Sequence, residues 1–89
     1  MTDIVEIRKE AVQAAQKAVE LDDAKNFEDA SKMYVKAAEK LSYLSKIDEN
    51  VYNKETYRKK AMEYVQRAKD LKDAVNNEDK KEPVASGGG

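Results

Sequence analysis

The sequence is short, rich in charge and almost free of residues that break helices. Its 89 residues make one small domain, and 17 basic and 18 acidic side chains leave a net charge of -1. A chain so balanced has no overall field that draws it to nucleic acid or to an anionic membrane. It has no cysteine and no histidine, which excludes disulfides and thiolate chemistry and removes the commonest metal ligand.

These exclusions predict a chain without a cofactor, a metal site or a catalytic role. Its many carboxylates stand at spacings typical of a solvated helix surface, whereas a catalytic pair needs a cleft. No apolar stretch approaches the ~20 residues of a transmembrane helix. The opening residues, MTDIVEIRKE, contain no apolar signal segment. We therefore expect a soluble cytoplasmic protein that does not insert into membranes.

The first predicted helix covers residues 3–23, with Asp3 as its N-cap. Its apolar residues recur three and four positions apart, as one helical face requires: Ile4, Ile7, Ala11, Ala14, Ala18 and Leu21. A second apolar row of Val5, Val12 and Val19 widens the apolar arc to roughly half of the helix. Such a helix either packs against two neighbours or offers one row to a binding partner.

Two further helices are expected, over residues 26–45 and from residue 53 to about Val75 or Asn77. Both repeat the three-four apolar step, and Asn26 and Asn53 are suitable N-caps. The link between the first two helices is only a few residues long, so these helices must form an antiparallel hairpin. The predicted fold is all-α, an antiparallel three-helix bundle running up-down-up with tetratricopeptide-like helix packing.

Residues 78–89, EDKKEPVASGGG, are polar and end in three glycines. This composition is typical of a flexible linker. We therefore predict a bundle over residues 1–77 and a linker over residues 78–89 that leads toward a downstream domain.

The segment YVKAAEKL at residues 34–41 is echoed by YVQRAKDL at residues 64–71. A helical-repeat protein needs about three such units, so a solenoid is disfavoured. Two helices that pack on the same neighbour would converge on this pattern. Alternatively, Val35 and Val65, with Met62 nearby, form an apolar strip in a groove that takes up a helix or an extended peptide.

The two segments that carry this echo resemble the MIT (microtubule-interacting and trafficking) domain, and the resemblance covers residues 4–76. The first family motif is matched at the turn into the second helix by Asp22, Asn26, Phe27, Glu28 and Ala30, and then by Tyr34 and Ala38. The second is matched in the third helix by Tyr64, Val65, Arg67, Ala68, Leu71 and Lys72. The chain looks most like the copy at the N-terminus of the AAA ATPases that remodel ESCRT-III polymers.

This resemblance implies a non-catalytic interaction module that binds the C-terminal tails of ESCRT-III subunits. It would recruit an AAA ATPase to membrane-remodelling polymers, in endosomal sorting or in archaeal cell division, and would reach membranes only through ESCRT-III. The isolated domain would be monomeric and its parent oligomeric. ATP and magnesium are implied only for a downstream ATPase domain, because this chain contains no GxxxxGK[ST] loop.

The resemblance also implies two binding modes, which use different grooves. In one, a helical tail motif lies between the second and third helices, where Val65 matches the apolar contact and Val35 lies nearby. Lys69 replaces the usual acidic residue there, and its charge would repel an arginine of that motif. In the other, an extended, proline-containing motif lies between the first and third helices. We prefer this second groove and assign five residues to it: Val12, Ala15, Val19, Lys25 and Met62.

Charge and composition leave one alternative function open. Residues 54–73 carry seven basic and four acidic side chains, whereas residues 3–23 carry three basic and six acidic ones. These charges are explained by attraction between packed helices, or by acidic residues that flank a bound tail motif. The alternative function is a tetratricopeptide-like peptide-binding adaptor of a chaperone or scaffold, which the single helical hairpin disfavours.

Overall fold

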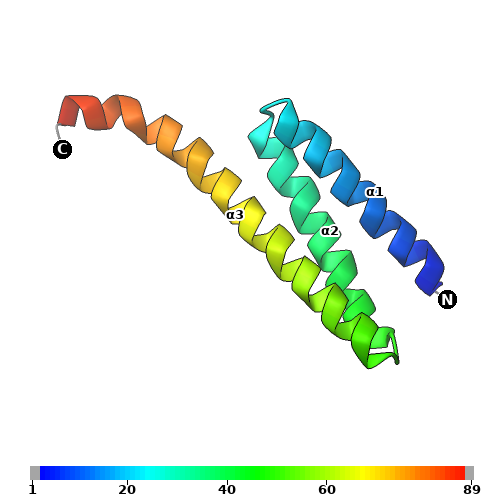
Figure 1. Ribbon diagram of the computed structural model, residues 1–89. Helices are drawn as coiled ribbons and strands as arrows, with labels where there is room; N and C mark the ends of the chain where they lie inside the picture. Colours follow the sequence, from blue (N-terminus) through cyan, green and yellow to red (C-terminus); the bar gives the residue numbers. More distant parts are fainter. Residues whose placement is uncertain (1–2, 88–89) are drawn as a thin grey trace.

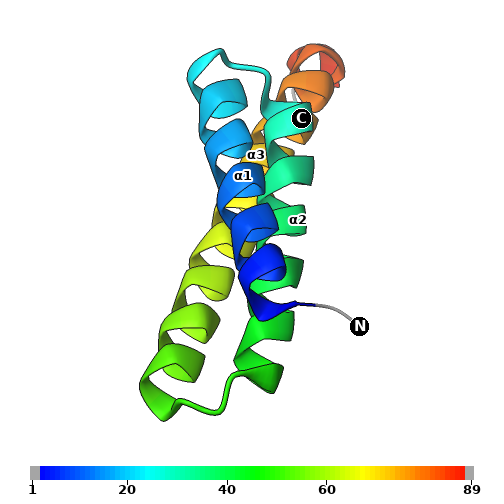
Figure 2. The same ribbon diagram turned by 90° about the vertical axis from the view of Figure 1, so that its right-hand side faces the viewer.

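The computed structural model describes residues 3–87 of the chain, and its side chains as far as Asn76. Over these residues all regular structure is helical: α1 (Ile4–Asp23), α2 (Phe27–Ile47) and α3 (Val51–Gly87). The three helices run up, down and up, and α2 lies between the other two in the view of Figure 1. Figure 2 shows α1 in front, with α2 on one side of it and the first half of α3 on the other. The predicted all-α three-helix bundle is confirmed.

Helix α1 begins where the sequence predicts. The carboxylate of Asp3 accepts a hydrogen bond from the backbone N–H of Val5 at 3.0 Å, which satisfies one of the donors left over at a helix start. Asn26 stands at the N-cap of α2, but its side chain donates instead to Asp29 at 3.1 Å.

The turn between α1 and α2 is a Schellman motif formed without glycine. The N–H of Asn26 donates to the carbonyl of Leu21 at 2.8 Å, and the N–H of Lys25 donates to the carbonyl of Asp22 at 2.9 Å. This pattern requires a left-handed residue after the helix, and Lys25 occupies that position with φ 65°. A side chain with a Cβ is less stable there than glycine.

The link between α2 and α3 differs from the prediction. Helix α3 begins at Val51, and its N-cap is Asn50, whose side-chain oxygen accepts from the N–H of Asn53 at 3.1 Å. Asp48 holds this link in place, because its carboxylate accepts from the N–H of Asn50 at 2.9 Å and from the side chain of Asn53 at 3.2 Å. The prediction of Asn53 as the N-cap is therefore wrong, and this residue supports the link from inside the first turn.

Helix α3 is longer than the sequence predicts, because it continues past Val75 and Asn77 to Gly87. No glycine or proline interrupts the chain before Pro83, so nothing in this stretch forces an earlier end. Figure 1 shows this last part of α3 running on beyond the ends of α1 and α2. Gly88 and Gly89 lie outside the described residues, and the division into a bundle and a linker stays a prediction.

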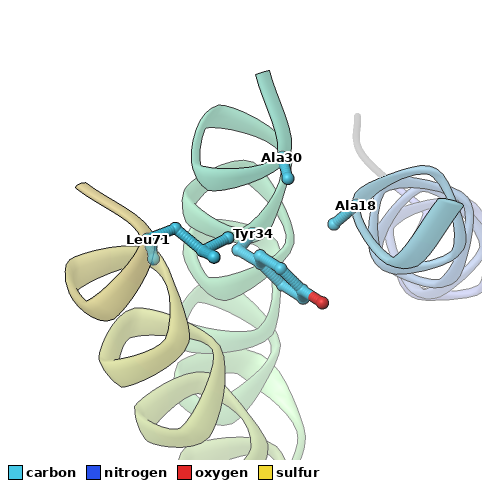
Figure 3. Packing of buried hydrophobic residues seen from close by; sticks show 5 residues of the cluster. Ala18, Ala30, Tyr34 and Leu71 are labelled. Atoms are coloured by element: carbon cyan, nitrogen blue, oxygen red, sulfur yellow. The ribbon is translucent and has the colours of Figure 1, made fainter. Parts of the chain in front are cut away.

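The core is built from one tyrosine, a few aliphatic side chains and many alanines. One cluster gathers the buried residues Ala18, Ala30, Tyr34, Ala68 and Leu71, and the other gathers Ile7, Ala11 and Leu44. Figure 3 shows Tyr34 reaching from α2 into the space between α1 and α3, with Ala18 on one side and Leu71 on the other. Alanines at these contacts allow the helices to pack closely around the large ring.

The packing explains most of the echo between α2 and α3. Tyr34 and Tyr64, at matching positions, contact each other with ring centroids 5.7 Å apart. Ala38 and Ala68 are both buried. The matching valines, Val35 and Val65, are not part of this core and are 39% and 53% exposed. The echo therefore combines a shared packing solution with an exposed pair that the core does not require.

The turn at Lys25 generates a stability prediction. Replacing Lys25 with glycine should raise the free energy of unfolding by about 0.5 kcal/mol, because the gain from relieving the left-handed Cβ exceeds the entropy that glycine adds to the unfolded chain. Urea denaturation measures the change. Lys25→Ala is the matched control, since it removes the same charge but keeps the Cβ. If the glycine variant is less stable than the alanine variant, the turn does not hold Lys25 in a left-handed conformation.

Candidate functional site

A groove separates α1 from α3 along much of the bundle. Within the described part of the chain, no Cα of α1 lies within 8 Å of a Cα of α3, whereas α2 packs against both. The space between them is an open groove of about 670 Å³. Its lining comes from all three helices: Arg8, Ala11, Val12, Ala15, Gln16, Val19 and Glu20 from α1, Leu41 from α2, and Thr56, Tyr57, Lys60 and Tyr64 from α3.

The groove is apolar because α1 carries two apolar rows and α2 covers only one of them. The row of Ala11, Ala14 and Ala18 is buried, whereas Val12 and Val19 are 50% and 47% exposed. Ala15 lies between these valines and is half-buried. Because alanine projects little from the helix, this wall is low at its centre, with a valine on each side.

Polar contacts cross the groove near both of its ends. Near the start of α1, Nε of Arg8 donates to the hydroxyl of Tyr57 at 3.1 Å. Near its end, Arg67 of α3 donates to both carboxylate oxygens of Asp22, from Nε at 2.8 Å and from a terminal nitrogen at 2.9 Å. These contacts tie α1 to α3 where their backbones do not meet, and they set the width of the groove between them.

Of the two contacts across the groove, the one made by Asp22 involves a charged side chain that is largely removed from solvent. Its side chain is 13% exposed, and it also accepts a hydrogen bond from the hydroxyl of Tyr34 at 3.0 Å. The hydrogen bonds from Arg67 lower the pKa of Asp22 despite the opposing effect of burial. Burial raises the pKa of Tyr34, and its hydrogen bond to Asp22 raises it further. The hydrogen bonds that Arg67 donates to Asp22 likewise raise the pKa of Arg67, so the pair stays charged at neutral pH.

Three of the five residues assigned to this groove line it, and two do not. Val12, Ala15 and Val19 lie together on its α1 wall. Met62 is not among the lining residues and is 66% exposed. It stands three positions before Val65, so the helical period places it on the same flank of α3 as Val65, away from α1. Lys25 lies in the turn beyond α1 and is exposed.

The alternative groove, between α2 and α3, also exists but is smaller. It measures about 340 Å³ and is lined by Val35, Ala38, Glu39, Ser42, Tyr43, Lys46 and Val65. Lys69 is exposed and follows Val65 by one helical turn. The three residues predicted for a helical motif therefore lie on one side of the bundle.

Sequence reasoning missed the α3 wall of the larger groove. Tyr57 and Tyr64 are half-buried and border the groove, yet neither was among the residues assigned to it from the sequence. It also missed the pairing of Asp22 with Arg67, although these residues stand in the two segments that carry the family motifs. An acid in one motif and an arginine in the other was a signal that could have predicted this ion pair.

The described part of the chain shows neither a metal-binding cluster nor a membrane-spanning helix. No three histidine, cysteine, aspartate or glutamate side chains lie close enough together there to hold a metal ion. None of its helices is both long enough and apolar enough to cross a membrane.

An apolar groove between the helices of a small bundle is typical of proteins that bind a segment of another chain. The chain belongs to the MIT (microtubule interacting and transport) domain family, whose family model matches residues 9–73. Neither a curated protein nor a solved structure matches the chain. Domains of this family are protein-interaction modules, typically without catalytic activity, and this chain is such a module.

The ion pair of Asp22 with Arg67 generates a second stability prediction. Replacing Asp22 with asparagine should lower the free energy of unfolding by about 1–2 kcal/mol, because a charged, bidentate hydrogen bond is lost at a site where Arg67 remains half-exposed. Thermal unfolding near neutral pH measures the loss. The control is Asp23→Asn, which removes an exposed carboxylate from the neighbouring position. Equal stability of the two variants would contradict a structural role for Asp22.

The same pair predicts a dependence on pH. Because the pKa of Asp22 is lower in the folded chain than in the unfolded chain, its contribution is present above about pH 4 and is lost as the pH falls through the folded pKa. The stability difference between the wild type and Asp22→Asn should therefore shrink on acidification below about pH 4. Denaturation at several pH values measures it, and a difference that grows toward acid pH would show the opposite shift.

Proposed function

We propose that this domain binds the C-terminal tails of ESCRT-III subunits as extended, proline-containing segments in the groove between α1 and α3. Through such binding it would bring an attached AAA ATPase to membrane-remodelling ESCRT-III polymers. The observation that carries the proposal is the open groove itself, in which the spare apolar row of Val12 and Val19 stands on either side of Ala15.

The dimensions of the groove suit a short extended segment. Val12 and Val19 are seven residues apart on α1, which corresponds to about 10 Å along the helix. An extended chain covers this length with about three residues. Burying a proline and two aliphatic side chains there contributes a few kcal/mol at ~25 cal/mol per Å², less the cost of ordering the segment.

The chemistry of the lining favours a segment that contains proline. An extended peptide presents backbone N–H groups that need acceptors, and the apolar row of α1 has none to offer. Proline has no N–H, so it lies against such a surface without an unpaired donor. Gln16 and Thr56, on opposite walls, can bond to the remaining backbone groups of the segment.

The smaller groove between α2 and α3 suits a helical tail motif less well. It has about half the volume of the larger one, and Lys69 stands one turn after its central valine. The ammonium of Lys69 opposes an arginine on a docked helix. A single site of the kind we propose is expected to bind with micromolar affinity, on the order of -8 kcal/mol, and several copies in an oligomeric parent would raise the avidity.

Two substitutions of matched chemistry test which groove is used. Ala15→Asp places a carboxylate at the centre of the α1–α3 groove and should abolish binding of an ESCRT-III tail peptide, because the charge must be desolvated by the apolar segment. Val65→Asp places the same charge in the other groove and should leave the affinity nearly unchanged. Both positions lie outside the core clusters, so both variants should fold.

Isothermal titration of each variant with the same tail peptide measures the affinity, and circular dichroism checks the helix content. Loss of binding in Val65→Asp with retention in Ala15→Asp would assign the tail to the α2–α3 groove. Retention in both folded variants would overturn binding in either groove.

A further inference from the structure

The charged residues that line the α1–α3 groove are separated by sign along its length. Arg8 stands near the start of α1 and bonds to Tyr57, and Lys60 follows Tyr57 by one helical turn. Both basic groups therefore lie toward one end of the groove. Glu20, the acidic residue of the lining, lies at the other end, beside the pair formed by Asp22 and Arg67.

The neighbouring charges do not cancel this separation. Both carboxylate oxygens of Asp22 already accept from Arg67, so that arginine is engaged and does not neutralise Glu20. At the other end, the hydrogen bond from the N–H of Asn50 lowers the pKa of Asp48 most, followed by that from Asn53 and the charge of Arg8, so this carboxylate is engaged chiefly by the link between α2 and α3.

The opposite charges at the two ends of the groove come chiefly from Lys60 and Glu20. Both line the groove and both are exposed, and neither takes part in an ion pair among the described residues.

We propose that the groove selects segments whose apolar centre is flanked by charges of opposite sign, acidic toward Arg8 and Lys60 and basic toward Glu20. The charges thereby fix the direction in which the segment lies. This inference rests on the proposed function, because it concerns the ligand of the same groove. It adds what an apolar groove alone lacks, since Val12, Ala15 and Val19 present nearly the same surface to a segment entered from either end.

The spacing of the charges sets the spacing required in the ligand. Arg8 and Glu20 are twelve residues apart on α1, which corresponds to about 18 Å along the helix. An extended chain covers this distance in five or six residues at about 3.3 Å each. The acidic and basic residues of a preferred segment are therefore about five positions apart, with the apolar, proline-containing centre between them.

Two peptides of the same composition provide the probe. Both share one apolar, proline-containing centre. One carries glutamates before the centre and lysines after it, and the other has these flanks exchanged. Both have blocked ends, so that terminal charges do not contribute. The wild-type domain should bind the two peptides in opposite directions, each with its glutamates toward Lys60 and its lysines toward Glu20. A nitroxide label at the peptide N-terminus should therefore broaden the amide resonances at the Arg8 end of the groove for the first peptide and at the Glu20 end for the second.

The decisive variant exchanges the groove charges without disturbing either polar contact across the groove. Lys60→Glu combined with Glu20→Lys keeps the net charge, the bond from Arg8 to Tyr57 and the pair of Asp22 with Arg67. This double variant should bind each peptide in the direction opposite to that in the wild type. The matched control is Lys36→Glu with Glu28→Lys, which exchanges two exposed charges on α2 outside both grooves and should keep the wild-type directions.

The outcomes separate this inference from the function on which it rests. The same direction for both peptides on the wild type, or unchanged directions in the double variant, overturns the charge-based direction. The proposed function then still stands if Ala15→Asp abolishes binding of either peptide. No measurable binding of either peptide to the folded wild type overturns both proposals. The preference of each peptide for one direction should also weaken with added salt, because exposed charge pairs are screened.

Discussion

The carboxylate of Asp22 joins all three helices at one point. From the last turn of α1 it accepts hydrogen bonds from Tyr34 of α2 and from Arg67 of α3. Elsewhere α1 packs against α2, and its backbone stays away from α3. The position of α1 relative to α3 therefore depends on this cluster and on the bond from Arg8 to Tyr57 at the opposite end. The groove between the two helices exists because these contacts hold its ends while its middle stays open.

This constraint also explains why the two family motifs contain the residues they do. Asp22 belongs to the motif at the turn into α2, and Arg67 to the motif in α3, 45 positions later. A carboxylate that is 13% exposed must be compensated, and removal of one partner leaves the other unpaired. Tyr34 supplies the third contact while its ring fills the core beside Ala18 and Leu71 (Figure 3). One set of residues thus serves core packing and groove geometry together.

The sequence predicted which helical face each residue occupies more reliably than it predicted what that face contacts. Periodicity identified the spare row of Val12 and Val19, and both residues line the groove. The same reasoning placed Met62 at an edge of its helix but could not tell which of two neighbours that edge faces. The start of α3 was misassigned because Asn50 and Asn53 are equally good caps by residue type, and only the contacts of Asp48 distinguish them. Nothing in the sequence indicated that Lys25 is left-handed, because the residue at this position of such a turn is usually glycine.

The open groove raises a physical question, because half-exposed valines would gain by closing against α3. Closure would require α1 to move toward α3, and that movement would displace Asp22 from Tyr34 and Ala18 from the cluster around it. The loss of both a satisfied, largely buried carboxylate and the packing around Ala18 opposes the gain from burying two side chains that are already partly covered. Because these contacts oppose closure, the walls of the groove are already in place before a ligand arrives. Only the bound segment then loses conformational freedom, and the domain does not. This lowers the free-energy cost of association for a module that binds through a few contacts.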